Sequence, residues 1–170
     1  VCVVADGYTA YPTPLAENSE KLFTSLETVD MDASSPVRIN EVLPKNRYSA
    51  MDKDGDRSDW VELYNASSET VNLGSYYLSD DESDPYKWGL PNRELAAGEY
   101  ILIFLSGKDI TDGEELHASF SLSTADKQLM LTCVDGMRRD TVYVPEGIGD
   151  NVSIGKNADG EQIYYGQPTP

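Results

Sequence analysis

The chain has 170 residues, of which 39% are hydrophobic and 25% charged, a globular composition sufficient for one domain with its own core plus an appendage. Its formal net charge is −17, from 30 acidic residues against 13 Lys and Arg, which argues against nucleic acid as a partner because such binding depends on clustered basic residues. No apolar run approaches the roughly 20 residues that span a bilayer, so we expect no membrane insertion by this sequence.

The first 35 residues do not share the pattern of the rest. Residues 6–14, which read DGYTAYPTP, are echoed by Asp159-Gly160 and by the closing run YYGQPTP at 164–170. The echo predicts that residues 1–14 are the last strand of a preceding copy of the domain that follows, within a longer tandem array. The alternative is a stray N-terminal strand and a chance match. Residues 15–35 are polar and acidic, and we expect a linker there, or a short helix.

From residue 36 onward, short apolar runs alternate with turn signals. In the run 60–64, alternation directs Val61 and Leu63 to one face of a strand and Trp60, Glu62 and Tyr64 to the other. Residues 99–105 are apolar on both faces, which predicts a central strand covered on both sides. Strands are expected at 37–43, 60–64, 70–79, 86–90, 99–105, 116–122, 128–134, 141–144 and 152–154.

These strands predict the fold class. Asp135-Gly136 between two apolar runs indicates a hairpin, and no window after residue 36 has helical periodicity of convincing length. Many short strands with frequent turns bury their apolar faces best as two packed layers. The sequence therefore predicts an all-β sandwich over residues 36–170.

An ordered series of short motifs runs through the same residues. The series is Ile39-Asn40-Glu41-Val42, Asp59-Trp60-Val61-Glu62-Leu63-Tyr64-Asn65, Val71-Asn72-Leu73, Tyr77-Leu78-Ser79-Asp80, Lys87-Trp88, Gly98-Glu99-Tyr100 and the closing Gln167-Pro168-Thr169-Pro170. Together these motifs resemble the lamin tail domain family. The resemblance implies an immunoglobulin-like β-sandwich without a catalytic motif, in which the shared residues pin turns and strand starts. These architectural residues are Asn40, Glu41, Trp60, Glu62 and Asn65.

The resemblance also implies a function. Bacterial members are typically non-catalytic modules of secreted or surface-anchored multidomain proteins, whereas in animal lamins the fold is a nuclear scaffold and interaction module. The acidic charge, the echoed ends and the Asp-rich loop resemble the bacterial extracellular branch. We therefore expect a non-enzymatic spacer or adhesion module, outside the cell or on its surface. Its expected partners are neighbouring domains of the same chain and a protein or cell-surface glycan.

The Asp-rich stretch 52–59, which reads DKDGDRSD, is where site chemistry is expected. Asp52, Asp54 and Asp56 at alternate positions begin like the ligand series of a helix-loop-helix calcium site. The series then fails, because Arg57 stands where glycine is required and Leu63 where the bidentate acid is required. With Asp59 as a further ligand, calcium would be the one cofactor, and a calcium-dependent carbohydrate- or protein-binding module is the alternative function. Otherwise the aspartates cap their own turns and no cofactor is bound.

Aromatic residues suggest a second binding feature. The chain has 11 Tyr, and four aromatic residues lie near predicted strand edges, namely Tyr76, Tyr77, Tyr86 and Trp88. Aromatic rings with a polar tip stack on sugars or anchor a protein partner. The alternative is that these rings cover the sandwich edge and lock turns.

Candidates for catalysis are few. His117 is the only histidine, it falls within a strand-like run, and the chain has no nucleophile-elbow motif. A hydrolase is thus the least favoured function. Cys133 lies in an apolar run and is expected to be a buried free thiol, while a disulfide with Cys2 would need an oxidising compartment and close geometry.

Overall fold

The computed structural model describes residues 4–5, 8–9, 35–122, 128–157 and 159–169. The chain falls into two units, residues 1–34 and 35–170. In the first unit, β1 (Val4–Ala5) pairs antiparallel with β2 (Tyr8–Thr9), so the part of residues 1–14 that is described holds two short strands and not one. The linker or helix predicted at residues 15–35 lies outside the described residues, apart from residue 35.

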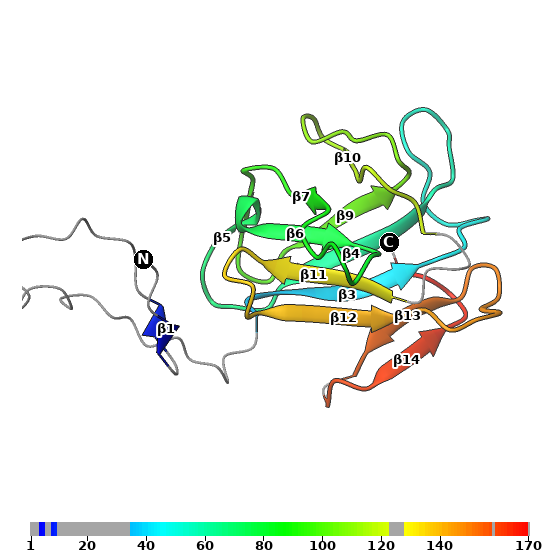
Figure 1. Cartoon of the computed structure of the whole chain (residues 1–170). Helices are drawn as coiled ribbons and strands as arrows, with labels where there is room; N and C mark the ends of the chain where they lie inside the picture. The colour runs from blue at the N-terminus through cyan, green and yellow to red at the C-terminus, as the bar shows by residue number, and fades with distance from the viewer. Residues whose placement is uncertain (1–3, 6–7, 10–34, 123–127, 158, 170) are drawn as a thin grey trace, which may run out of the picture. The chain divides into compact units, whose positions relative to one another are not determined.

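The second unit is a sandwich of two main sheets (Figure 1). One sheet has six strands, in the order β10 (Leu116–His117), β9 (Tyr100–Leu105), β4 (Asp59–Asn65), β3 (Val37–Leu43), β13 (Ser153–Lys156) and β14 (Gln162–Tyr165). The other has four, in the order β12 (Arg139–Tyr143), β11 (Gln128–Cys133), β6 (Tyr76–Ser79) and β7 (Trp88–Gly89). Neighbouring strands are antiparallel, except that β10 runs parallel to β9. The all-β, immunoglobulin-like sandwich predicted from the sequence is confirmed.

The main hydrophobic core lies between the sheets. Val61 and Leu63 of β4 are fully buried there with Leu78 of β6 and Leu131 of β11, so the prediction that these two residues share one face of the strand is confirmed. Cys133, at the end of β11, is a buried free thiol in this core. No described helix has the length and hydropathy to cross a membrane.

A second, smaller hydrophobic cluster lies on the other face of the six-stranded sheet. Register places Leu43 opposite Trp60 and Trp60 opposite Phe104, so one row of side chains crosses β3, β4 and β9. Ala50, from the loop after β3, packs on this row. Only this end of the outer face is covered, because Tyr100 at the start of β9 is 54% exposed. The prediction that β9 is covered on both sides is therefore wrong for its first half.

The predicted strand at 70–79 is divided in the structure. The side-chain oxygen of Asn72 accepts a hydrogen bond from the Gly74 amide at 2.8 Å and starts a 3₁₀ turn, η2 (Leu73–Ser75). A Cβ at Gly74 would lie 2.2 Å from Oδ1 of Asn92, so a larger residue there would have to displace the Asn92 side chain. As a result β5 (Val71–Asn72) leaves the four-stranded sheet and pairs with β8 (Glu94–Leu95), a strand that the sequence did not predict.

Candidate functional site

The acidic loop, residues 52–56, folds around the side chain of its first aspartate. The Asp52 side chain is fully enclosed. Its Oδ1 accepts hydrogen bonds from the backbone amides of Asp54 at 3.0 Å and Asp56 at 2.8 Å. The backbone carbonyl of Asp52 accepts a further hydrogen bond from the Gly55 amide at 2.9 Å. Gly55 has a φ of 85°, a left-handed conformation that glycine adopts without strain. The loop is thus closed by its own aspartate.

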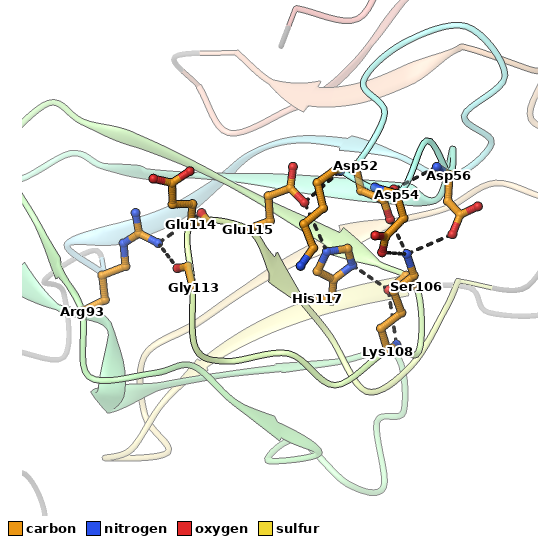
Figure 2. A network of polar contacts seen from close by, with 11 residues as sticks. Asp52, Asp54, Asp56, Arg93, Ser106, Lys108, Gly113, Glu114, Glu115 and His117 are labelled. Atoms are coloured by element: carbon orange, nitrogen blue, oxygen red, sulfur yellow. Dashed lines mark hydrogen bonds and ion pairs between the residues drawn. The ribbon is translucent and has the colours of Figure 1, made fainter.

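A lysine from a distant segment sits among the three carboxylates (Figure 2). The Nζ atom of Lys108, which follows β9, lies 2.5 Å from Oδ2 of Asp52, 3.1 Å from Oδ2 of Asp54 and 2.9 Å from Oδ2 of Asp56. Burial acts to raise the pKa of Asp52, but the hydrogen bond from Lys108 and those from the loop amides together lower it. The pKa of Lys108 is raised, first by its hydrogen bond to Asp52. At neutral pH the cluster is a set of ion pairs.

This arrangement bears on the predicted calcium site. The Lys108 ammonium group takes the central position that a cation among Asp52, Asp54 and Asp56 would need. Within the part of the chain that the structure describes, no three His, Cys, Asp or Glu side chains are grouped to hold a metal ion. Asp59 has a different partner, because its Oδ1 accepts a hydrogen bond from the Asn46 amide at 3.3 Å. Burial raises the pKa of Asp59 to about 6. Calcium binding stays a prediction.

The acidic loop lies beside the only histidine of the chain. Glu115 Oε2 accepts a hydrogen bond from the Lys53 amide at 3.0 Å and lies 3.8 Å from Nε2 of His117. The other ring nitrogen of His117, Nδ1, is 2.9 Å from the Ser106 hydroxyl (Figure 2). The imidazole also stacks on Phe104, with ring centroids 5.2 Å apart.

A serine, a histidine and an acid in contact resemble a nucleophilic triad in composition only. The His117 side chain is fully buried, so no substrate atom can reach it to exchange a proton. Its Nε2 has no hydrogen-bond partner among the described residues. The Ser106 hydroxyl also accepts a hydrogen bond from the Lys108 amide at 3.3 Å, which ties the network to the segment that carries the lysine. The arrangement connects β10, the acidic loop and the end of β9.

Of the four aromatic residues predicted to form a binding edge, two are buried and two lie at the surface. Tyr76 and Trp88 are 3% and 4% exposed, so the prediction that they form an exposed edge is wrong. Tyr76 and Leu78 point to the same core face of β6, and Trp88 lies opposite Leu78 in the ladder with β7. Burial of the Trp88 ring is compatible with its polar atom because Nε1 donates a hydrogen bond to Oδ1 of Asp109 at 2.9 Å.

The other two aromatic residues remain at the surface. Tyr86 is 43% exposed and Tyr77 is partly buried. Their rings meet edge to face, with centroids 5.1 Å apart and an interplanar angle of 90°. This pair matches the alternative in which aromatic side chains pack on one another at the edge of the sandwich.

Two of the predicted architectural residues, Asn40 and Glu41, connect β3 to its neighbouring segments. The register of β3 on β4 shifts between Ile39 and Glu41, so Asn40 is the extra residue of a β-bulge. Its Nδ2 donates a hydrogen bond to Oε1 of Glu62 on β4 at 2.7 Å. Glu41, which is 2% exposed, accepts hydrogen bonds from the Ser153 hydroxyl and from the hydroxyl and amide of Thr169. Glu41 thereby joins β3, β13 and the last residues of the chain.

Asn65 and Trp60 have equally defined places. Asn65 is fully buried, and its Nδ2 donates to the carbonyls of Glu69 at 2.8 Å and Leu95 at 2.9 Å. Its Oδ1 accepts from the amide and hydroxyl of Ser67, so one side chain fixes the whole turn after β4. Trp60 is the centre of the second hydrophobic cluster.

Sequence reasoning missed Lys108 and Ser106 altogether. Lys108 lies 56 residues from Asp52 along the chain, and no local pattern marks a lysine that pairs with a distant acidic loop. Tyr48 was also missed, although it is the most exposed large hydrophobic residue in the part of the chain that the structure describes, at 85%. Its position after Pro44, in a polar segment that ends a strand, is the signal that could have marked it as a loop aromatic.

Comparison with known proteins agrees with the architecture. No curated protein is significantly similar in sequence to the chain. The model of one family, described as Lamin Tail Domain, matches residues 31–146, which is more than half of the chain. The match ends before β13 and β14, which continue the same six-stranded sheet. Domains of this family are immunoglobulin-like and generally serve as non-catalytic interaction modules. The chain belongs to the lamin tail domain family.

Proposed function

We propose that residues 36–170 are a non-catalytic interaction or spacer module of a larger secreted or surface-anchored bacterial protein, joined to neighbouring domains of the same chain. The observation that carries the proposal is the enclosed state of His117. Among the described residues, Ser106, His117 and Glu115 have the composition of a catalytic set, but the His117 side chain is fully buried and the hydrogen bonds of the group hold segments together. A fold whose polar networks are structural supports binding at its surface and not chemistry within it.

The charge and the echoed ends support the cellular setting. A net charge of −17 keeps a protein soluble and separate from nucleic acid and from anionic membrane surfaces. The echo of DGYTAYPTP near the end of the chain supports a tandem array of such modules. A spacer or adhesion role follows from these two properties, because an array presents the same surface several times along one chain.

One experiment tests the absence of catalysis. The full chain is incubated with p-nitrophenyl acetate, p-nitrophenyl phosphate and p-nitrophenyl glucosides, in parallel with Ser106→Ala. We expect both proteins to release p-nitrophenol at the rate of buffer. Release above buffer that is lost in Ser106→Ala would overturn the proposal.

A second experiment tests the location. Intact cells that make the parent protein are treated with an added protease and probed with an antibody raised against residues 36–170. We expect the antibody signal to fall without lysis of the cells. A signal that falls only after lysis would show that the module is inside the cell.

A further inference from the structure

A groove of about 700 Å³ lies at one end of the six-stranded sheet, apart from the acidic loop and His117. It is lined by residues 48–50 after β3, residues 150–151 before β13 and residues 166–168 after β14. These segments meet because Val42 pairs with Ile154 and Ser153 pairs with Tyr165, which brings the end of β3, the start of β13 and the end of β14 together. The volume is in the range of about 300 to 1,000 Å³ that is typical of small-molecule sites.

One wall of the groove is held rigidly by Asn151. Its Oδ1 accepts hydrogen bonds from the amides of Arg47 at 2.8 Å and Tyr48 at 2.9 Å, and its own amide donates to the Lys45 carbonyl at 2.8 Å. Asn151 has a φ of 55°, a left-handed conformation that is uncommon for residues other than glycine, though Asn tolerates it best. The Arg47 and Tyr48 amides are therefore fixed from a neighbouring segment.

The buried side chain of Asn46 fixes the same loop through further hydrogen bonds. It is 5% exposed, and its Nδ2 donates to the carbonyls of Ala50 at 2.7 Å and Ser58 at 2.9 Å. Its Oδ1 accepts a hydrogen bond from the Ser49 amide at 3.0 Å. Two asparagines thus specify the backbone on both sides of Tyr48, while the Tyr48 ring itself is 85% exposed.

A rigid loop that presents an aromatic ring to solvent is suited to recognition. Burial of a tyrosine ring is favourable, and the Tyr48 ring in this loop is not buried. Because the loop is already ordered, a ligand that stacks on Tyr48 would not lose affinity to the ordering of the backbone. Tyrosine also presents a large contact area with only two side-chain torsions to fix.

The rest of the lining indicates the class of ligand. The Ser49 hydroxyl, the Gln167 amide and the Asp150 carboxylate supply both donors and acceptors. None of the lining residues is Leu, Ile, Val, Phe or Met, so the groove has no apolar pocket for the anchor side chain of a protein partner. A sugar ring has an apolar C–H face that stacks on an aromatic ring, and hydroxyl groups that donate and accept around its edge. Asp150 forms an ion pair with Arg47 at 3.5 Å, and the net charge of −17 over the whole chain disfavours an anionic sugar.

We propose that this groove binds a neutral saccharide, with Tyr48 stacked on a sugar ring and Gln167 and Asp150 hydrogen-bonded to its hydroxyls. This proposal rests on the proposed function of the domain as an interaction module, and it names neutral saccharides as the class of ligand that the module binds. It places the binding surface at the loop ends near residues 48, 150 and 167, and not at the aromatic edge near Tyr77 and Tyr86.

The test is a titration of the full chain with neutral tetrasaccharides, namely cellotetraose, maltotetraose, chitotetraose and mannotetraose. Backbone amide NMR shifts are followed up to about 10 mM sugar, a concentration at which millimolar binding is measurable. We expect at least one sugar to give saturable shifts concentrated at residues 45–51, 150–151 and 166–167. Tyr48→Ala should weaken that binding roughly tenfold, with an unchanged melting curve because the ring is exposed.

The matched control is Tyr143→Ala. Tyr143 is 61% exposed on β12, and its backbone contacts Gln162 at the start of β14, whereas the groove lies beyond the end of that strand. We expect no change in sugar binding. The proposal is overturned if none of the four sugars gives saturable shifts, if the shifts lie elsewhere, or if both tyrosine variants weaken binding equally. Each of these results leaves the non-catalytic module in place, because the p-nitrophenyl and protease experiments test it independently.

Discussion

Replacing Glu41 with Gln tests whether one buried carboxylate joins the two ends of the domain. Glu41 is 2% exposed, and its two oxygens accept three hydrogen bonds, from the Ser153 hydroxyl and from the hydroxyl and amide of Thr169. Gln has nearly the same shape, so the change leaves no cavity. It replaces one acceptor oxygen by an NH₂ group, so the single oxygen that remains can face either Ser153 or Thr169 but not both.

The cost can be worked out from these three contacts. Hydrogen bonds to charged groups contribute about 1.5 to 3 kcal/mol each, and neutral ones about 0.5 to 1.5. Loss of one bond and conversion of the others from charged to neutral should lower the free energy of unfolding by about 2 to 4 kcal/mol. The loss has a local signature as well, because the Thr169 amide should exchange its hydrogen faster when its acceptor is a neutral amide oxygen or is lost, depending on the orientation of the Gln side chain.

The assay is urea unfolding followed by the fluorescence of Trp60 and Trp88, both of which are buried. The matched control is Glu62→Gln. Glu62 lies directly opposite Glu41 in the β3–β4 ladder and accepts one hydrogen bond, from Asn40, which a Gln oxygen can also accept. Burial raises the pKa of Glu62, and the nearby charge of Glu41 adds to this, so neutralising Glu62 should be harmless or slightly stabilising. Equal losses in the two variants, or unchanged exchange at Thr169, would refute the reasoning.

Three further predictions concern the acidic loop and its surroundings. Lys108→Met should lower the unfolding midpoint at pH 7, whereas Lys53→Met, an exposed lysine of the same loop, should not. The folded pKa of Asp52 is below its ordinary 3.8, so the loss of midpoint caused by Lys108→Met should be complete above pH 4 and should shrink as the pH falls further. A loss of midpoint that does not depend on pH would contradict the ion pair. Removing calcium with a chelator should leave the midpoint unchanged, since the Lys108 ammonium already lies among the three carboxylates where a cation would bind. A calcium site with a Kd of about 10 µM would instead add about 2.7 kcal/mol at 1 mM calcium. Asp59→Asn should stabilise the fold by about 1 to 2 kcal/mol at pH 7.5 and have no effect near pH 3.5. The reason is that burial penalises only the ionised carboxylate and raises the folded pKa of Asp59 to about 6, above the ordinary 3.8. Equal effects at both pH values would exclude this cause.

The sequence by itself determined the architecture of the sandwich. A period of two fixes which side chains share a face of a strand, so alternation alone placed Val61 and Leu63 on one face and Trp60 on the other. The hairpin at Asp135-Gly136 was predictable for a local reason, because Gly136 has a φ of 69° that suits glycine. The order of short motifs was enough to identify the family. All of these signals are contained within a few neighbouring residues.

Only the tertiary structure decided which side chains meet and which are covered. Trp88 was expected at an exposed edge, but the ladder of β6 with β7 turns its ring into the core and Asp109 satisfies its Nε1. Three closely spaced aspartates indicated a cation, and the fold places Lys108 among them from 56 residues away. The physical reason is that strand register joins segments remote in sequence, and burial and charge depend on those neighbours more than on the residue itself.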